Sequence, residues 1–435
     1  MIKKIIPGDP EMIRTRSFAL NTVAAACGLA LMTAGQAQAG GYKIPEQSIN
    51  STALSAAYVA NAHGADATYF NPAAMVFNEG GRALEVDLSL IHLSRISATT
   101  AIQDRSQIEN FLVPTFHYVS DDMDGLRYGF SAISPAGLSK RWHGLGAAFA
   151  DEFTLKTLEL NPTIGYKIND SFSLGGGVRA VFSKGKVTSS DSAIGAVPVG
   201  RHLTGDSWDF GYNLALHFKP SDNLDLSATY RSKIDLTVEG NAQLSYLGTT
   251  HYDGGASVTV PIPAALNLAA AYTFDRTTLE LVLERTYWSS YKNLDFDYSS
   301  PPLSGVGAIN TALVGAFDVP KTKNWSDSNT IRIGLTHELD NQWTVMAGFA
   351  YDETPVPKQY AGYELPDSDA KIVSLGARYK YSDDLTIGAA FLYDKKDKLT
   401  IPAGLNTTNG NTLLGGAEFK DASAYFITVG MEYAF

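Results

Sequence analysis

The feature that most restricts the fold of this chain is an alternation of apolar and polar residues from Arg82 to the C-terminus. Every second residue from 208 to 218 is apolar, with Asp209, Gly211 and Asn213 among the residues between. The last stretch, ITVGMEYAF, has apolar residues at every second position from 427 to 435. Such alternation is typical of β-strands with one apolar face. We therefore predict an all-β fold from residue 82 onward.

The connections between these segments alternate in length. Six short polar turns, SDDMDG, KINDS, KPSDN, FDRT, ELDNQ and YSDD, each lie between two alternating segments, whereas we expect long loops at residues 186–207 and 295–328. Two strands around each turn and one at each end make about 14. Short turns at one end and long loops at the other are typical of an antiparallel transmembrane β-barrel. An even count puts both termini on the short-turn, periplasmic side.

A soluble sandwich or propeller is the alternative, because soluble sheets also alternate. Many of the segments exceed 10 residues, which is long for soluble strands. Their polar face consists mainly of Gly, Ser, Thr, Asn and Asp, which suits a wet lumen. Outside the N-terminus, no apolar run reaches the roughly 18–20 residues of a membrane-spanning helix. A closed barrel also leaves no unpaired sheet edge facing lipid.

Residues 1–39 read as a secretory signal peptide. Basic residues at 3, 4, 14 and 16 precede the apolar stretch FALNTVAAACGLALMTA, and Ala37-Gln38-Ala39 is a small-x-small cleavage site. Met12 is an alternative start. The only cysteine, Cys27, lies in this segment, where lipidation is a less favoured alternative. A chain cleaved after Ala39 has no disulfide and no thiol nucleophile.

Charge and motif content exclude several classes of function. Removing the four basic and two acidic residues of the signal from totals of 34 and 45 leaves 30 and 43, a net charge of −13. Nucleic acid binding needs a basic face, so we expect no nucleic acid partner. No GxSxG, HExxH or P-loop motif is present, and the eight histidines are scattered. We expect no enzymatic activity, cofactor or metal.

Residues 40–81 separate the signal from the first strand. This segment is rich in Ala, Ser, Asn and Gly, yet it contains apolar anchors such as Ile44, Leu54, Tyr58 and Met75. A free tail would not need such anchors. We expect this segment to fold into the lumen as a plug, with residues 82–435 forming the barrel.

Five stretches, YFNPAAM, ATYRSKIDLTVEG, YWSSYKNL, YDETPVP and the final YAF, resemble the FadL family of outer-membrane long-chain fatty acid transporters. The resemblance covers nearly the whole mature chain. It implies a 14-stranded barrel whose N-terminal hatch plugs the lumen. It also implies capture of a hydrophobic ligand in an outer groove, hatch movement, and sideways exit through the barrel wall without an energy source. Asn71-Pro72-Ala73 matches the hatch motif, although Asn-Pro also forms simple turns.

The third predicted strand, GLRYGFSAISPAGLSKRW, contains the candidate wall kink Ser134, Pro135 and Gly137. Proline lacks the N–H that a strand ladder needs, and a closed barrel has no edge strand that could tolerate it. The alternative is that the strand ends here. The family resemblance places a kink in this strand and favours an opening.

A ligand carboxylate needs cationic side chains. Arg179 and Arg332 lie on the polar faces of their strands, and Lys184, Lys186, Lys321 and Lys323 lie at loop ends. The deep-pocket arginine that the resemblance implies falls near Ser189, where no arginine is present. Lys184 or Lys186 could replace it, or the ligand could be an uncharged hydrocarbon. Each lysine could also face lipopolysaccharide phosphates.

The leading function is therefore passive outer-membrane uptake of long-chain fatty acids or related hydrophobic molecules. Uptake of aromatic or other uncharged hydrocarbons, a general aqueous porin and a structural or adhesive protein are the alternatives. Expected partners besides the ligand are outer-membrane lipid, lipopolysaccharide and the outer-membrane assembly machinery, which recognises terminal strands such as ITVGMEYAF. A monomer is expected.

Overall fold

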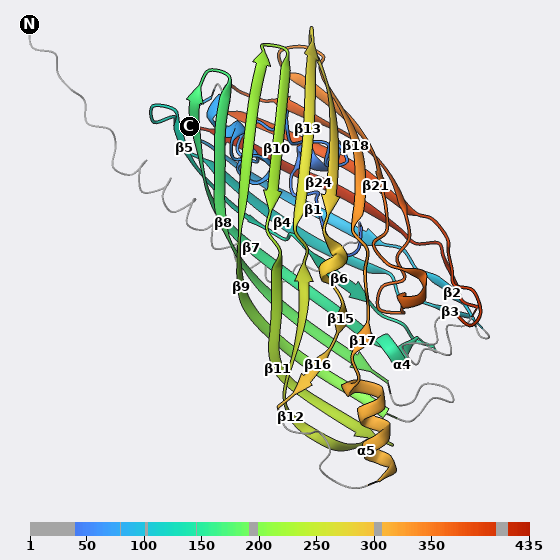
Figure 1. Cartoon of the computed structure of the whole chain (residues 1–435). Coiled ribbons are helices and arrows are strands. Elements are labelled where there is room, and N and C mark those ends of the chain that lie inside the picture. The colour runs from blue at the N-terminus through green and yellow to red at the C-terminus, as the bar shows by residue number, and fades with distance from the viewer. Residues whose placement is uncertain are drawn as a thin grey trace, which may run out of the picture.

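The computed structural model describes residues 40–78, 80–100, 103–144, 146–190, 199–299, 307–405 and 416–435. The predicted signal peptide lies outside these residues. Within them, no helix is both long and apolar enough to cross a membrane. The described chain is dominated by one large antiparallel sheet, which forms an elongated barrel around the N-terminal residues (Figure 1).

Fourteen strands form the barrel in the described residues, and three of them are broken into two consecutive pieces. They are β1 (Ala83–Leu93), β4 (Glu109–Val119), β5 (Leu126–Ile133) with β6 (Gly137–Lys140), β7 (Glu152–Asn169), β8 (Phe172–Ser189), β9 (Val199–Ser221), β10 (Leu224–Arg231) with β11 (Ile234–Tyr246), β12 (Thr249–Ile262) with β13 (Ala265–Phe274), β14 (Thr277–Thr286), β18 (Ser328–Glu338), β19 (Trp343–Asp352), β20 (Ala370–Lys380), β21 (Leu385–Lys396) and β24 (Ser423–Ala434).

The remaining elements are short. The N-terminal segment, residues 40–78, contains α2 (Ile49–Ala53), α3 (Ala67–Phe70) and η1 (Ala74–Phe77). The other helical turns are α4 (Ala147–Ala150), η2 (Trp288–Ser290), α5 (Ala308–Leu313), η3 (Val314–Asp318) and η4 (Lys358–Tyr360). A small sheet combines β2 (Ser97–Thr99), β3 (Gln103–Arg105), β22 (Leu399–Thr400) and β23 (Glu418–Lys420); β15 (Asn293–Leu294) pairs with β17 (Lys321–Thr322), and β16 (Phe296–Tyr298) pairs with β12.

The first and last strands close the barrel. β1 pairs with β24 from Ala83↔Ala434 to Leu93↔Ala424, and its other side pairs with β4. The six short turns join β4 to β5, β7 to β8, β9 to β10, β13 to β14, β18 to β19 and β20 to β21. The predicted closed barrel of about 14 antiparallel strands is therefore confirmed.

The alternation in the sequence sets the two faces of the wall. In β9, Phe210 is 68% exposed and Leu214 is 55% exposed, whereas Asn213 on the opposite face is buried. In β24, the side chains of Ile427, Val429, Met431 and Tyr433 point outward, as the sequence predicts. An exposed apolar band around a closed sheet suits contact with lipid.

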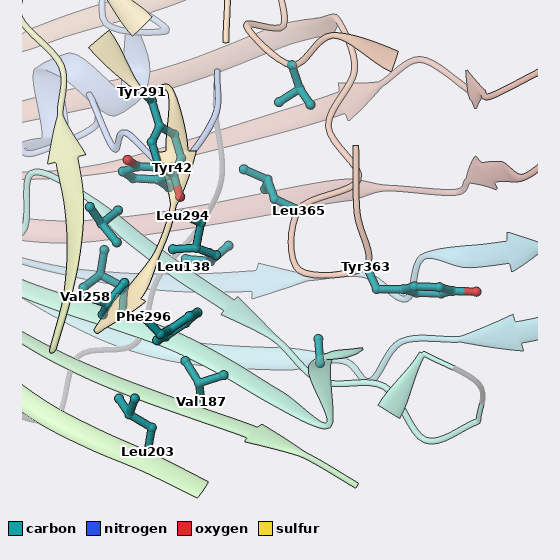
Figure 2. Packing of buried hydrophobic residues seen from close by; sticks show 14 of the residues in the cluster. Tyr42, Leu138, Val187, Leu203, Val258, Tyr291, Leu294, Phe296, Tyr363 and Leu365 are labelled. Atoms are coloured by element: carbon teal, nitrogen blue, oxygen red, sulfur yellow. The ribbon is translucent and has the colours of Figure 1, made fainter. Parts of the chain in front are cut away.

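The apolar face switches sides at two of the strand breaks. In β13, Leu268 and Tyr272 lie on the exposed face. Beyond the break at Pro263 and Ala264, the apolar residues of β12, such as Val258 and Val260, are buried. The break between β10 and β11 at residues 232–233 has the same effect. The long-loop end of the barrel is consequently apolar inside, and its largest buried cluster lies there (Figure 2).

Candidate functional site

The N-terminal segment is held by hydrogen bonds to strands around the whole barrel. The hydroxyl groups of Thr52 and Thr428 lie 3.0 Å apart, and Arg332 Nη1 donates to the Ser55 carbonyl at 3.0 Å. The N–H groups of Val59 and Ala60 donate to one carboxylate oxygen of Glu280. These bonds connect the segment to β24, β18 and β14. Further hydrogen bonds, described in the next paragraph, connect it to β8 and β10. Because these strands surround the barrel axis, the segment occupies the lumen.

Asn71-Pro72-Ala73 is anchored on the opposite part of the wall. Asn71 Nδ2 donates to the Val59 carbonyl and to Ser227 Oγ, each at 2.9 Å, and Ser173 Oγ donates to the Ala73 carbonyl at 2.7 Å. The turn fits against two glycines. A Cβ on Gly175 would lie 2.4 Å from the Ala73 nitrogen, and one on Gly165 would lie 2.3 Å from the Pro72 carbonyl oxygen. These glycines allow the backbone to approach the wall closely.

Ser134, Pro135 and Ala136 form the break between β5 and β6, and Gly137 begins β6. The freed backbone groups bind the N-terminal segment. Ile44 N–H donates to the Pro135 carbonyl at 3.0 Å, and Gly137 N–H donates to the Tyr42 carbonyl at 2.7 Å.

The side chain of Gln47 forms two hydrogen bonds with the same break. Its amide donates to the Ser134 carbonyl at 2.7 Å and accepts from the Ser134 N–H at 3.1 Å. Residues 42–47 therefore replace part of the ladder that the broken strand lacks.

The wall is interrupted between β4 and this broken strand. β4 pairs with β5 only through residues 116–119, and the described ladder of β6 runs to β7. Contact with the broken strand resumes further along, where Gln107 N–H donates to the Arg141 carbonyl at 2.8 Å and Arg141 Nε donates to Glu109 at 2.8 Å. Pro114, in β4, lies just beyond the paired residues 116–119 and so borders the interruption; it was not predicted from the sequence.

An apolar cavity lies at the long-loop end. It is lined by Leu138, Leu155, Val187, Val258, Leu294, Phe296 and further apolar residues, and Tyr42 closes its inner end. Figure 2 shows Tyr42 beside Tyr291, with Leu294, Leu138 and Phe296 below them in the view. We call this space the outer apolar cavity.

Tyr42 is firmly packed at this position. The centre of its ring lies 4.8 Å from the ring centre of Trp288 and 5.8 Å from that of Trp325. Its hydroxyl donates to the Pro261 carbonyl at 2.5 Å. Four aromatic rings, including Tyr291, therefore separate the outer apolar cavity from the space beneath.

A second cavity shares Phe153, Leu294 and Phe296 with the outer apolar cavity and contains three cations, Arg201, Lys321 and Lys323. Lys323 forms an ion pair with Glu364. Among the described residues, no carboxylate forms an ion pair with Arg201 or Lys321. We call this space the cationic cavity.

Arg201 is a cation close to the position where the sequence lacks the arginine that the family resemblance implies. It lies directly across the β8–β9 ladder from Ser189, the position where the family resemblance implies an arginine. Its guanidinium lies 4.4 Å from the ring centre of Phe296 and 5.0 Å from that of Phe317. Sequence spacing alone gives no register between strands, so the position of Arg201 opposite Ser189 could not have been deduced.

Lys184 and Lys186 are not part of either cavity. On β8 the side chains of odd-numbered residues, such as Arg179 and Val187, point inward, and Lys184 and Lys186 therefore point outward. Lys186 binds Glu152 at 2.5 Å. The expectation that one of them replaces the missing arginine does not hold in this structure, because both side chains lie on the outer face of β8, away from the cavities.

An inner cavity lies below Tyr42. It is lined by Lys43, Arg179, Arg231, Glu284 and Arg332, by Pro72 of the N-terminal segment and by Pro135 of the wall break. Its free volume is about 80 Å³, below the roughly 300–1,000 Å³ typical of small-molecule sites. The outer apolar cavity has a free volume of only about 40 Å³, so neither cavity holds a long-chain ligand unless it widens.

The chain matches known outer-membrane proteins over most of its length. Residues 30–435 match the family model described as "Outer membrane protein transport protein (OMPP1/FadL/TodX)". The chain belongs to this family.

Named relatives agree with the family model. A long-chain fatty acid transport protein of Escherichia coli (strain CFT073) is 25% identical over 80% of this chain and 84% of its own length. Outer membrane protein P1 of Haemophilus influenzae (strain Rd) is 23% identical over 85% of this chain and 89% of its own length.

Solved structures share the fold. A Pseudomonas aeruginosa FadL homologue has a TM-score of 0.75 at 21% identity, covering 91% of this chain and 100% of its own. The P. putida toluene transporter TodX has a TM-score of 0.67 at 18% identity, covering 89% and 98%. The chain is thus an outer-membrane β-barrel of a transport family and not an enzyme. Within the described ranges, no cluster of His, Cys, Asp and Glu side chains could hold a metal ion.

Proposed function

We propose that this protein takes up long-chain fatty acids or related hydrophobic molecules across the outer membrane by passive diffusion. The observation that carries this proposal is the outer apolar cavity, which adjoins three cations at one end and Tyr42 at the other. A long tail gains free energy in the apolar cavity because it leaves water. A carboxylate gains charge-assisted hydrogen bonds from Arg201 and Lys321, because Lys323 is already paired with Glu364.

The N-terminal segment is the proposed hatch, and residues 40–81 are its proposed bounds. Tyr42 and Lys43 separate the outer and inner cavities, so a ligand can pass only when these residues move. Asn71-Pro72-Ala73 is anchored on β8 and β10, away from the wall break. Residues 42–47, by contrast, bind the break directly, so they are the part of the proposed hatch whose movement would open it.

The proposed exit is lateral, through the interruption between β4 and the β5–β6 break. Pro135 lines the inner cavity and also lies in the broken strand. A ligand that leaves there enters the bilayer without crossing bulk water, and an amphiphile with a long tail gains from that route. Outer-membrane lipid is therefore a proposed partner, together with lipopolysaccharide around the outer end.

Uptake of uncharged aromatic hydrocarbons is the second candidate. The apolar cavity is rich in aromatic rings, and several similar solved structures are described as toluene transporters or monoaromatic hydrocarbon channels. An uncharged ligand needs no cation. The three cations that adjoin the cavity favour the fatty acid.

Uptake measurements separate these candidates. We expect a Gram-negative host that lacks related transporters to take up radiolabelled oleate when it produces this protein. Loss of one charged donor costs about 1.5–3 kcal/mol, so Arg201→Gln should raise the oleate concentration for half-maximal uptake about tenfold or more. Toluene uptake should stay unchanged.

Three outcomes would contradict this account. Toluene uptake without oleate uptake would favour the hydrocarbon channel. An unchanged half-saturating concentration for oleate in Arg201→Gln would remove the cationic cavity from the proposal. Large steady conductance in planar bilayers would indicate an aqueous porin, because a plugged lumen carries little ion current.

A further inference from the structure

A buried cluster of Arg179, Glu159 and Arg231 forms one wall of the inner cavity. Arg179 donates to Glu159 Oε2 through Nε at 3.1 Å and through Nη2 at 2.9 Å. Arg231 Nη2 binds the other carboxylate oxygen of Glu159. Glu159 is fully buried, and Arg179 is 1% exposed. Two guanidinium groups therefore share a single carboxylate, which leaves the cluster with a net charge of +1.

One nitrogen of this cluster lacks a hydrogen-bond partner, and it belongs to Arg231. Arg179 donates from its third nitrogen, Nη1, to the Ser232 carbonyl at 2.7 Å, whereas Nη1 of Arg231 is buried without a hydrogen-bond partner among the described residues. Both arginines line the inner cavity. A buried charge without full compensation is costly, and it favours binding of a counter-charge.

The other carboxylate of the inner cavity is already occupied. Glu284 accepts from Lys43 Nζ at 2.6 Å and from Thr286 Oγ1 at 2.9 Å, and Arg332 approaches it at 3.9 Å. It therefore does not neutralise Arg231. A group with one negative charge and two acceptor oxygens would complete the arginine pair.

Arg231 is also linked to the N-terminal segment. Its guanidinium lies 4.3 Å from the ring centre of Tyr69, which belongs to α3. Tyr69 lines the same cavity. A ligand on Arg231 would thus contact both the wall and the proposed hatch. Arg231 lies in ATYRSKIDLTVEG, one of the five stretches that resemble the FadL family.

We propose that Arg231 and Arg179 form a second, inner carboxylate site, distinct from the cationic cavity. This inference rests on the proposed function. The head group of a fatty acid that has passed Tyr42 binds Arg231 and contacts Tyr69, while its tail lies toward Pro135 and the wall break. Uncharged amphiphiles of the same length pass without using this site.

The test compares dodecanoate with 1-dodecanol in the host used for oleate uptake. In Arg231→Gln, the maximal rate of dodecanoate uptake should fall about tenfold because a charge-assisted pair is lost, while 1-dodecanol uptake stays unchanged. Arg231→Lys keeps the charge and should retain most of the dodecanoate uptake. Arg276→Gln, in the turn between β13 and β14, is the matched control and should change neither rate.

The readouts separate this inference from the proposed function. Arg201→Gln acts on the outer site and should change the half-saturating concentration, whereas Arg231→Gln should change the maximal rate. Equal slowing of both compounds in Arg231→Gln, or no slowing, would overturn the inner site alone. If the wild-type protein takes up neither compound, the proposed function fails and the inner site fails with it. Heat-modifiable migration of each variant in gels verifies that its barrel is folded.

Discussion

At the scale of single residues, the direction of each side chain decides which cations can meet a ligand. Six cations are candidates from the sequence, and their positions in the structure divide them. Lys321 and Lys323 line the cationic cavity, and Arg179 and Arg332 line the inner cavity. The remaining two, Lys184 and Lys186, point outward. Alternation in the sequence shows which residues of one strand share a face. It does not show which residue of the next strand lies opposite, and Arg201 could not be predicted for that reason.

Glu46 is a buried acid within the N-terminal segment. It is 3% exposed, and both of its carboxylate oxygens lack a hydrogen-bond partner among the described residues. Burial raises the pKa of Glu46 from its ordinary value of 4.5 to about 7, and nearby Arg332 opposes part of this rise. Asp394 and Asp352 also face it and raise the pKa further.

The segment should therefore loosen as the pH rises. The protonated form of Glu46 is favoured in the folded state, so its contribution is complete below pH 4.5 and is lost as the pH approaches about 7. Hydrogen exchange of the amides near residues 44–48, corrected for intrinsic rates, should be faster above this window than below it. Glu46→Gln should abolish the difference. A pH dependence that persists in Glu46→Gln would contradict this role.

At the scale of elements, most of the barrel could be predicted from the sequence, because alternation and short turns are local signals. All six turns and the closure of β24 on β1 follow from them. The breaks in β10–β11 and β12–β13 could not be predicted. The same alternation continues on both sides of each break, and only the paired strands show that the apolar residues face outward on one side and inward on the other. The pairing of residues 42–47 with the β5–β6 break could not be predicted either, since it joins segments that are far apart in the sequence, such as Gln47 and Ser134, 87 positions apart.

The β5–β6 break is the element on which lateral exit depends. Pro135→Val restores a backbone N–H and allows an extended strand, which should extend the pairing of β4 with the third strand. We expect oleate uptake to fall about tenfold or more while the barrel stays folded, because each 1.4 kcal/mol of added barrier slows passage tenfold.

Pro162→Val in β7 is the matched control. Pro162 is exposed on the outer face of an unbroken strand, so its replacement should leave uptake unchanged. Normal uptake by Pro135→Val, with a crystal structure showing a continuous third strand, would refute exit through this break.

At the scale of the whole molecule, the barrel is a closed ring of strands, interrupted between β4 and the β5–β6 break, around a segment that is bonded to it on many sides. The apolar anchors of residues 40–81 indicate a packed element in the lumen, but they do not indicate which contacts must open. The structure concentrates backbone bonds to the wall break in residues 42–44. Recognition of the C-terminal strand by the assembly machinery, the periplasmic position of both termini and the monomeric state stay predictions.

A reversible disulfide between the N-terminal segment and the wall break tests the central claim most directly. Lys43 and Ala136 form an antiparallel bridge, and such pairs have the Cα spacing that a disulfide needs. Lys43→Cys with Ala136→Cys, in a Cys27→Ser background, locks the segment when oxidised. Ala83→Cys with Ala434→Cys, across the barrel closure, is the control pair. We predict that oxidation stops oleate uptake in the first pair only and that reduction restores it; unchanged uptake by the oxidised first pair would contradict the account.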